Sequence, residues 1–203
     1  MLNVIRKLFG PPSVVIAAGM GIPSHTQPLI IPKLSWEVKE GARGWSEYVF
    51  QAINGQFFDA LDKAKDTERI FPGYSKLSRV QRIAVLSEMI ASISFFESSW
   101  NPKAELPNEK DNSFWALGLM QVSVNDQKNH GLKYNYTFEQ LKRPRPNLHL
   151  ALTILSKQVE KTGYLILSNK NPSKYWATFL DGNEHSKVNE VIARIKENFD
   201  PGK

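Results

Sequence analysis

The spacing of apolar residues along the chain predicts a mainly helical protein. Between positions 36 and 65, apolar residues recur at intervals of three and four, as in a helix that buries one face. These residues are Trp45, Tyr48, Val49, Ala52, Ile53, Phe57, Phe58 and Leu61. Because Asn54-Gly55 interrupts the series, we expect two helices here, or one helix broken at this point. The stretch 25–35, which has two prolines and no period, is expected to be an extended linker.

Three further helices are expected in the rest of the chain. Ser78 has the side chain typical of an N-cap, and the apolar pattern after it predicts a helix over about 79–99. Similar patterns predict helices over 146–161 and, before Pro201-Gly202, over 188–199. The sequence has no repeat and no block of strand-like alternation. The fold class expected from the residues is therefore mainly α.

Two acids in the helix predicted over 79–99 lie on different faces. A single apolar stripe, with spacings of three and four, runs through Ile83, Leu86, Ile90, Ile93 and Glu97. Glu97 is therefore expected to face the core at the end of its helix. Glu88 lies on the opposite face of the same helix and is expected to be solvated.

A carboxyl group among apolar neighbours has chemical consequences. Desolvation disfavours the charged form and raises the pKa, so Glu97 is expected to hold a proton near neutral pH. A general acid that protonates the leaving oxygen of a glycosidic bond needs this property. The periodicity alone fits equally well a structural glutamate that is capped by backbone donors or paired with Lys or Arg.

Two short motifs around this acid resemble a known family. The segment ESSWNP (97–102), followed by ALGLMQV (116–122), resembles the paired motifs of the soluble lytic transglycosylase (SLT) domain, a member of the lysozyme-like superfamily that cleaves peptidoglycan. The resemblance covers about 77–203 and is strongest over 90–122. It implies a lysozyme-like α-helical catalytic domain at 78–203. A helical N-terminal extension would then occupy 25–77, where the aromatic residues either pack onto the catalytic lobe or extend the glycan groove.

The resemblance also implies roles for individual residues. Glu97 would be the catalytic acid and then the base, and Ser98 a nearby orienting hydroxyl. The sugar-binding wall would consist of Gly118, Leu119, Met120 and Gln121. Judged by its residue type alone, Met120 would more often belong to the core.

A third family motif, Ala-Tyr-Asn, is replaced here by Lys174-Tyr175-Trp176-Ala177. Tyr175 is expected to bring its hydroxyl near Glu97 and to take part in substrate binding. Trp176 either stacks on a sugar or fills the core. The departure from the family pattern bears on fine specificity and on activity itself.

The number of acids in the site distinguishes the possible reactions. Hydrolysing glycosidases usually need two carboxyl groups, but Glu105, Glu109 and Asp111 lie on a polar stretch and are interpreted as surface charges. A mechanism with one acid is therefore expected. The resemblance implies a peptidoglycan lytic transglycosylase, which cleaves the MurNAc-GlcNAc β-1,4 bond and forms 1,6-anhydro-MurNAc. The alternatives are a goose-type-lysozyme-like muramidase and a catalytically silent peptidoglycan-binding component.

Composition narrows the list of partners and cofactors. The 26 Lys and Arg outnumber the 20 Asp and Glu, which favours an anionic partner such as a wall polymer or merely keeps the surface solvated. The basic run at 142–146 contains no aromatic residue and is interpreted as a loop, so no nucleic-acid partner is predicted. The chain has no Cys, and its four His show no metal-binding spacing. We therefore expect neither a cofactor nor a metal.

The N-terminal pattern resembles a signal peptide. Arg6 and Lys7 precede an apolar run at 14–22, and a polar break follows from Pro23. The apolar run is shorter than the roughly 20 residues that span a bilayer. Residues 1–24 are therefore expected to be a leader segment, which directs the protein to the periplasm or out of the cell. The alternative is a flexible or buried cytoplasmic leader.

Overall fold

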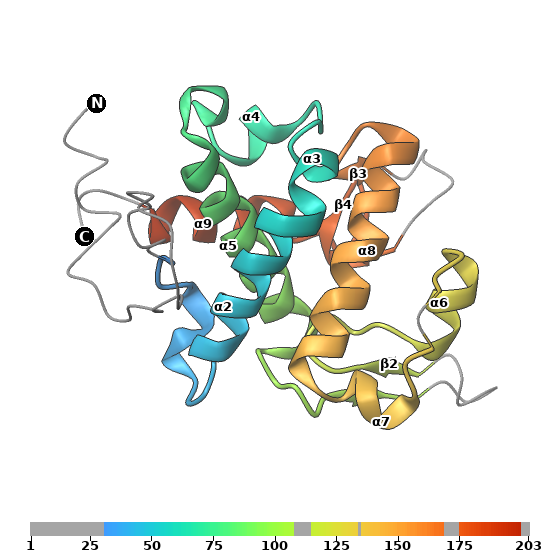
Figure 1. The fold of residues 1–203 in the computed structure, drawn as a ribbon. Helices are drawn as coiled ribbons and strands as arrows, with labels where there is room; N and C mark the ends of the chain where they lie inside the picture. The colour runs from blue at the N-terminus through green and yellow to red at the C-terminus, as the bar shows by residue number, and fades with distance from the viewer. Residues whose placement is uncertain (1–30, 108–114, 134, 169–174, 200–203) are drawn as a thin grey trace, which may run out of the picture.

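The computed structural model describes residues 31–107, 115–133, 135–168 and 175–199, and most of them are helical (Figure 1). The mainly α fold class is thus confirmed. The leader predicted at 1–24 lies outside the described residues. Among the helices of the described part, none is both long enough and apolar enough to cross a membrane.

The segment before Ser78 is a succession of short helices. They are η1 (Ser35–Val38), α2 (Arg43–Ala52), η2 (Ile53–Phe57), α3 (Phe58–Leu61), α4 (Thr67–Ile70) and η3 (Tyr74–Lys76). The break expected at Asn54-Gly55 is a π-helical turn, η2, which connects α2 to α3 without a gap. The prediction of one interrupted helix therefore describes this region correctly.

Helix α5 (Arg79–Ser98) is the central element of the fold. It begins as predicted at Ser78, whose Oγ accepts from the Gln81 N–H (3.4 Å) while the Gln81 side chain accepts from the Ser78 N–H (2.9 Å). It ends where Ser99 and Trp100 both adopt positive φ. The Trp100 indole N–H donates to the Ala91 carbonyl (2.8 Å) and so fixes this end of the helix.

The remaining elements form a small lobe and the closing helices. Strand β1 (Glu105–Leu106) pairs antiparallel with β2 (Ala116–Leu117), and β3 (Leu167–Ser168) pairs parallel with β4 (Leu180–Asp181). The helices here are α6 (Val124–Asn129), α7 (Phe138–Leu141), α8 (Pro144–Thr162), η5 (Ala177–Phe179) and α9 (Val188–Asn198). The basic run at 142–146 is not entirely a loop, because Pro144 begins α8, where its missing N–H has no consequence.

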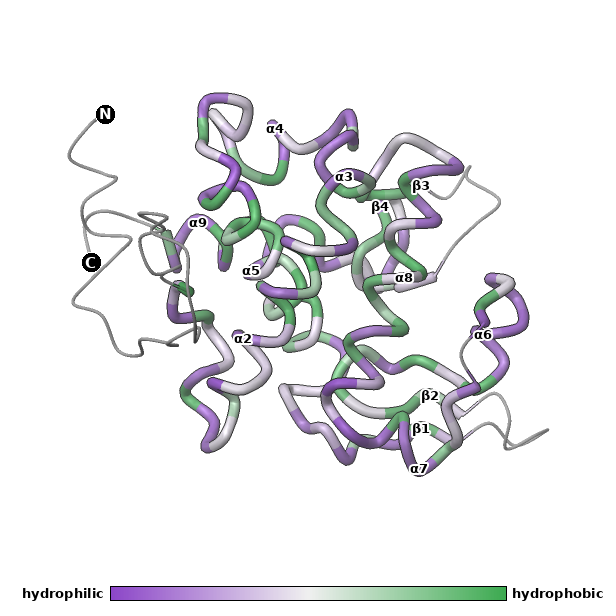
Figure 2. The backbone as a smooth tube through the Cα atoms, in the orientation of Figure 1, coloured by the Kyte–Doolittle hydropathy of each residue, from purple (hydrophilic) through white to green (hydrophobic). Residues whose placement is uncertain are grey.

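One hydrophobic core unites the described residues. The buried apolar side chains run from Leu34 to Phe199 in a single cluster, and the apolar stretches of the chain meet along α5 and α8 (Figure 2). Trp36 is fully buried, and its indole N–H donates to Ser46 Oγ (2.8 Å). The N-terminal helices therefore pack onto the rest of the protein. The domain boundaries at 24 and 77 stay predictions.

Glu88 is buried, so the prediction that it is solvated is wrong. It has no exposed surface, and its carboxylate accepts from the Ser35 N–H (2.9 Å), from Ser92 Oγ (3.1 Å) and from Asn198 Nδ2 (2.9 Å). The physical reason is that η1 and α9 both pack on α5, so the face opposite the apolar stripe is also covered. Both oxygens of the buried carboxyl group have donors, as is usual for buried polar groups.

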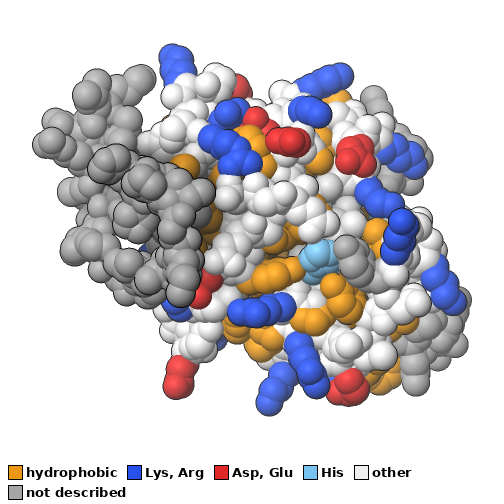
Figure 3. Space-filling model, in the orientation of Figure 1, with side chains coloured by type: hydrophobic (Ala, Val, Ile, Leu, Met, Phe, Trp, Pro, Cys, Tyr) orange, Lys and Arg blue, Asp and Glu red, His pale blue; other side chains and the backbone are white. Residues whose placement is uncertain are grey.

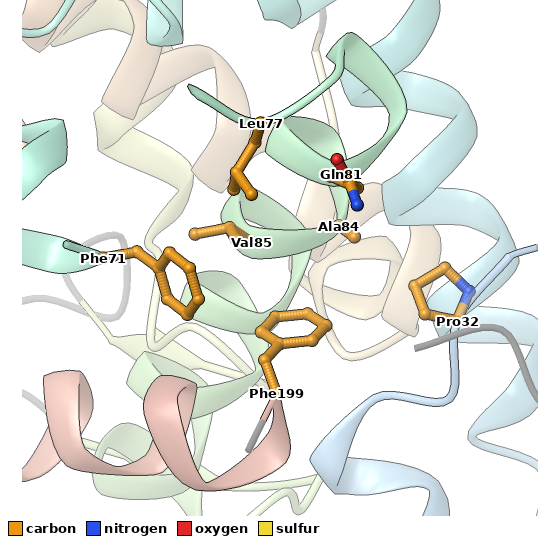
Figure 4. A pocket seen from close by; sticks show the side chains of 7 residues that line it. All are labelled: Pro32, Phe71, Leu77, Gln81, Ala84, Val85 and Phe199. Carbon is orange, nitrogen blue, oxygen red and sulfur yellow. The ribbon is translucent and has the colours of Figure 1, made fainter. Parts of the chain in front are cut away.

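A small pocket lies away from the motif segments, between α5 and the end of α9 (Figure 4). It is lined by Pro32, Phe71, Leu77, Gln81, Ala84, Val85 and Phe199. These residues include no acid or base, so the pocket lacks the groups needed for catalysis. Glu97 and Ser98 lie elsewhere, in the last turn of α5.

Candidate active site

Glu97 lies in the last turn of α5 and is half-buried. Burial raises the pKa of its carboxyl group above the usual value, as predicted, and a hydrogen bond from the Thr178 hydroxyl acts in the opposite direction. Thr178 belongs to η5, which is 81 residues away in sequence. The site is therefore built where the end of α5 meets a distant turn.

Ser98 connects the helix end to the ALGLMQV segment. Its Oγ lies 2.9 Å from the Leu119 carbonyl oxygen and 3.1 Å from the Ser94 carbonyl oxygen, and it donates to them. This hydroxyl therefore fixes the segment beside Glu97 and, among the described contacts, makes no hydrogen bond to the acid itself. Its predicted part in orienting a substrate stays a prediction.

Gly118 is held against Asn147 more closely than any other residue type allows. Its φ is +67°, and an added Cβ would lie 2.5 Å from Asn147 Nδ2 and 2.7 Å from the Leu141 carbonyl oxygen. Asn147 Nδ2 donates to the carbonyls of Leu117 (2.6 Å) and Leu141 (2.8 Å), and its Oδ1 accepts from the Met120 N–H (2.9 Å). The buried Asn147 amide in the first turn of α8 thus fixes the backbone of the ALGLMQV segment.

The four residues predicted as a sugar-binding wall differ in exposure. Leu119 and Met120 have no exposed surface, and Gly118 is also buried. Gln121 is half-buried, has a φ of 48°, and donates from Nε2 to the Gly118 carbonyl (2.9 Å). In this structure the side chains of Leu119 and Met120 thus pack in the core, and the contact of all four with sugar stays a prediction.

Tyr175 is hydrogen-bonded to a second carboxylate, that of Asp126. Its hydroxyl donates to Asp126, which also accepts from the Ser123 N–H (2.5 Å) at the start of α6. Burial raises the pKa of Tyr175 well above its usual value, and the negative charges of Asp126 and then Glu97 raise it further. Tyr175 therefore stays neutral, within electrostatic reach of Glu97. Its predicted role in substrate binding stays a prediction.

Trp176 fills the core, which resolves the two possibilities left by the sequence. It is 5% exposed, and its indole N–H donates to the Met120 carbonyl (2.8 Å). This bond joins the segment at 175–178 to the ALGLMQV segment. Three parts of the chain, the end of α5, the segment after β2 and the turn at η5, are thus tied together around Glu97.

The comparison with known families agrees with this arrangement. Residues 77–176 match the family model named Transglycosylase SLT domain. The chain contains a transglycosylase SLT domain. The match supports the peptidoglycan lytic transglycosylase family that the resemblance implied. No curated protein matches the chain.

Solved structures share the fold of the SLT domain and of the helices before it. The structure titled Bd0314 DslA wild-type form 2 has a TM-score of 0.71 and 22% sequence identity, covering 84% of this chain and 98% of that one. A glutamate-to-glutamine mutant of Bd0314 DslA has a TM-score of 0.70 and 23% identity, with 84% and 97% covered. The likeness confirms the lysozyme-like α-helical fold.

The site contains two polar residues that sequence reasoning missed. Thr178 contacts Glu97 and Asp126 contacts Tyr175, yet neither belongs to a motif identified in the sequence. Asp126 had one local signal, because it follows Ser123 by three residues as in a capping box. Thr178 had no such local signal, since it lies in a short turn where apolar residues do not recur at a regular interval.

The structure gives no second acid beside Glu97 among the candidates that it describes. Glu105 is paired with Lys142 (3.2 Å), and Lys142 also pairs with Glu139 (2.8 Å). Glu109 and Asp111 lie outside the described residues. Within the part of the SLT domain and its extension that is described, no group of three or more His, Cys, Asp or Glu is arranged to hold a metal ion.

Proposed function

We propose that the protein is an active peptidoglycan lytic transglycosylase that cleaves the MurNAc-GlcNAc β-1,4 bond and forms 1,6-anhydro-MurNAc. The observation that carries this proposal is the half-buried Glu97, whose raised pKa allows it to hold a proton where the segments of the SLT domain meet. Such a group suits general acid catalysis near neutral pH, because the protonated form must be present at the start of the reaction.

The reaction needs one acid that acts twice. Glu97 donates its proton to the glycosidic oxygen, and the C1–O4 bond breaks as the GlcNAc side leaves. The acetamido group of the substrate stabilises the cationic centre at C1. The Glu97 carboxylate then takes the proton of the C6 hydroxyl, and O6 bonds to C1 to close the anhydro ring. No water is consumed, and Glu97 ends the cycle protonated.

The described carboxylates support this route over hydrolysis. A muramidase would need a second carboxyl group to hold a water molecule or to act as a nucleophile. Asp126 accepts from Tyr175 and Ser123, and Glu105 is paired with Lys142 on the surface. Both groups are therefore engaged in structural contacts, which leaves Glu97 as the acid suited to proton transfer.

Charge supports an acidic wall polymer as the substrate. Lys and Arg exceed Asp and Glu by six, and Figure 3 shows basic side chains spread over the visible face without a dense patch. Spread positive charge favours contact with an extended polymer that carries many carboxylates. We therefore propose that the protein works in the bacterial cell envelope, in the periplasm or outside the cell, on glycan strands.

Clearance of purified sacculi by a Glu97→Gln variant tests the role of this acid. Gln has nearly the same shape but cannot donate the proton, so we expect clearance to fall by at least about 100-fold. Glu105→Gln is the matched control, because it removes a surface glutamate, and it should clear like the wild type. Unchanged clearance by Glu97→Gln would remove Glu97 from the mechanism. No clearance by the wild type would favour the catalytically silent wall-binding protein.

A further inference from the structure

Thr178 is held in place from several sides. Its carbonyl accepts from the Lys187 N–H (2.7 Å) just before α9, and the Phe179 N–H donates to the Trp176 carbonyl (3.0 Å) within the same turn. Trp176 in turn donates to the Met120 carbonyl (2.8 Å), and β4 begins two residues after Thr178. A side chain on such a fixed turn has a fixed position relative to α5.

Three hydroxyl groups gather near Glu97, and they have different partners. The Ser98 hydroxyl donates to backbone carbonyls, and the Tyr175 hydroxyl donates to Asp126. The Thr178 hydroxyl donates to Oε1 of Glu97. Among the described hydroxyls of the site, Thr178 is therefore the one that is directed at the acid.

A hydrogen bond to one carboxyl oxygen determines where the proton is carried. A protonated carboxyl group has one carbonyl oxygen and one O–H, and the carbonyl oxygen is the better acceptor. With the Thr178 hydroxyl donating to Oε1, Oε2 is the oxygen left to carry the proton of Glu97. The turn that carries Thr178 thereby selects the oxygen from which a proton can be delivered.

We propose that Thr178 is a positioning residue that keeps the proton of Glu97 on Oε2 and so directs it toward the glycosidic oxygen. The role of Thr178 in catalysis rests on the proposed function, whereas its hydrogen bond to Glu97 does not. The hydroxyl also stabilises the carboxylate that forms after proton transfer, since a hydrogen bond to the charged form favours that form.

Kinetics of Thr178→Val and Thr178→Ser test this role. Val keeps the shape of Thr and loses the hydroxyl. We expect kcat to fall about tenfold with little change in KM, which is a part of the rate enhancement that a positioned general acid supplies. The alkaline limb of the pH profile should move to higher pH, because the carboxylate loses a donor and the acid form persists. Thr178→Ser keeps the hydroxyl donor, so its kcat and its pH profile should match those of the wild type. An unchanged pH profile in Thr178→Val would overturn the proposal.

Titration of the Glu97 carboxyl by 13C NMR tests the contact without any turnover. Glu97→Gln assigns the signal, and circular dichroism checks that each variant is folded. We expect Thr178→Val to titrate at higher pH than the wild type and Thr178→Ser to titrate with the wild type. If Val does not fold, Thr178→Ala serves as the second variant without the hydroxyl. Identical titration of the hydroxyl-free variant and the wild type refutes the proposal. If Glu97 titrates at higher pH in Thr178→Val than in the wild type, but the wild type does not cleave peptidoglycan, only the proposed function is refuted.

Discussion

Two carboxyl groups nine residues apart in α5 are both desolvated, but their surroundings suit them to different tasks. Glu88 has donors on both oxygens, from the backbone of Ser35 and from two side chains, and it has no exposed surface. Glu97 is half-buried, with the hydroxyl of Thr178 on one oxygen. A group that is enclosed and fully bonded stabilises the fold, whereas a partly open one can exchange a proton with a substrate.

The enclosed glutamate should make stability depend on pH. Burial raises the pKa of Glu88 to about 7, despite the hydrogen bonds from Ser35 and Ser92 and the positive charge of Arg194. Because this value lies above that of the unfolded chain, the stabilising contribution is complete below about pH 4.5 and is lost as pH rises through about 7. The loss is on the order of 3 kcal/mol.

Thermal unfolding of Glu88→Gln across pH measures this contribution. The amide has nearly the same shape and no charge, so its Tm should fall less than that of the wild type between about pH 5 and pH 9. Other groups titrate equally in both proteins, so the difference between the two curves isolates Glu88. Parallel curves would show that Glu88 does not titrate in this range.

At the scale of elements, the segment after β2 depends on one contact between a glycine and an amide. Gly118 leaves the space that Asn147 fills, and Asn147 then bonds the backbone on both sides of that glycine. The segment lies beside Glu97 through the bond from Ser98 to Leu119. A change at Gly118 should therefore affect both the stability of the fold and the site.

Gly118→Ala should destabilise the protein by about 2 to 4 kcal/mol in urea unfolding, because Cβ would collide with Asn147 at a φ that Ala rarely adopts. Clearance of sacculi should fall as well, even at temperatures where the variant is folded. Gly44→Ala is the matched control, since its Cβ would meet nothing within 4 Å and it lies in α2. That variant should be neutral or slightly more stable. Equal stability of both variants would contradict the packing described at Gly118.

At the scale of the whole molecule, the helices before Ser78 and the SLT domain share one core. Trp36, Phe50 and Ile53 are fully buried in the same cluster as α5 and α8. The Asn198 side chain also donates to the Lys33 carbonyl (3.2 Å), so α9 holds the start of the described chain. The family match begins at residue 77, but the packing unit begins before it.

Removing the N-terminal helices should therefore unfold the SLT domain. We expect a fragment of residues 77–203 to lack a cooperative thermal transition in circular dichroism, because it would expose the apolar surface that these helices cover. A fragment of residues 31–203 keeps the core and should unfold in a single transition. A cooperative transition in the shorter fragment would show that residues 77–203 fold without the N-terminal helices and would contradict the shared core.

Local signals in the sequence predicted the elements well. The cap at Ser78 and the apolar period of α5 and α9 were correct, because helix starts and amphipathic faces depend on neighbouring residues. The predicted exposure of Glu88 was wrong, because the spacing of apolar residues shows which face of a helix is apolar but not whether other helices cover the opposite face. Thr178 was missed because its contact spans 81 residues and depends on the tertiary fold.

The mass of the muropeptides released from purified peptidoglycan tests the central claim most directly. Intramolecular attack by the C6 hydroxyl adds no water, so we predict products ending in 1,6-anhydro-MurNAc, each lighter by one water than the hydrolysis product. Incubation in water enriched in 18O should leave these products unlabelled. Reducing-end products that contain one added water, labelled with 18O, would contradict the transglycosylase mechanism and show a muramidase instead.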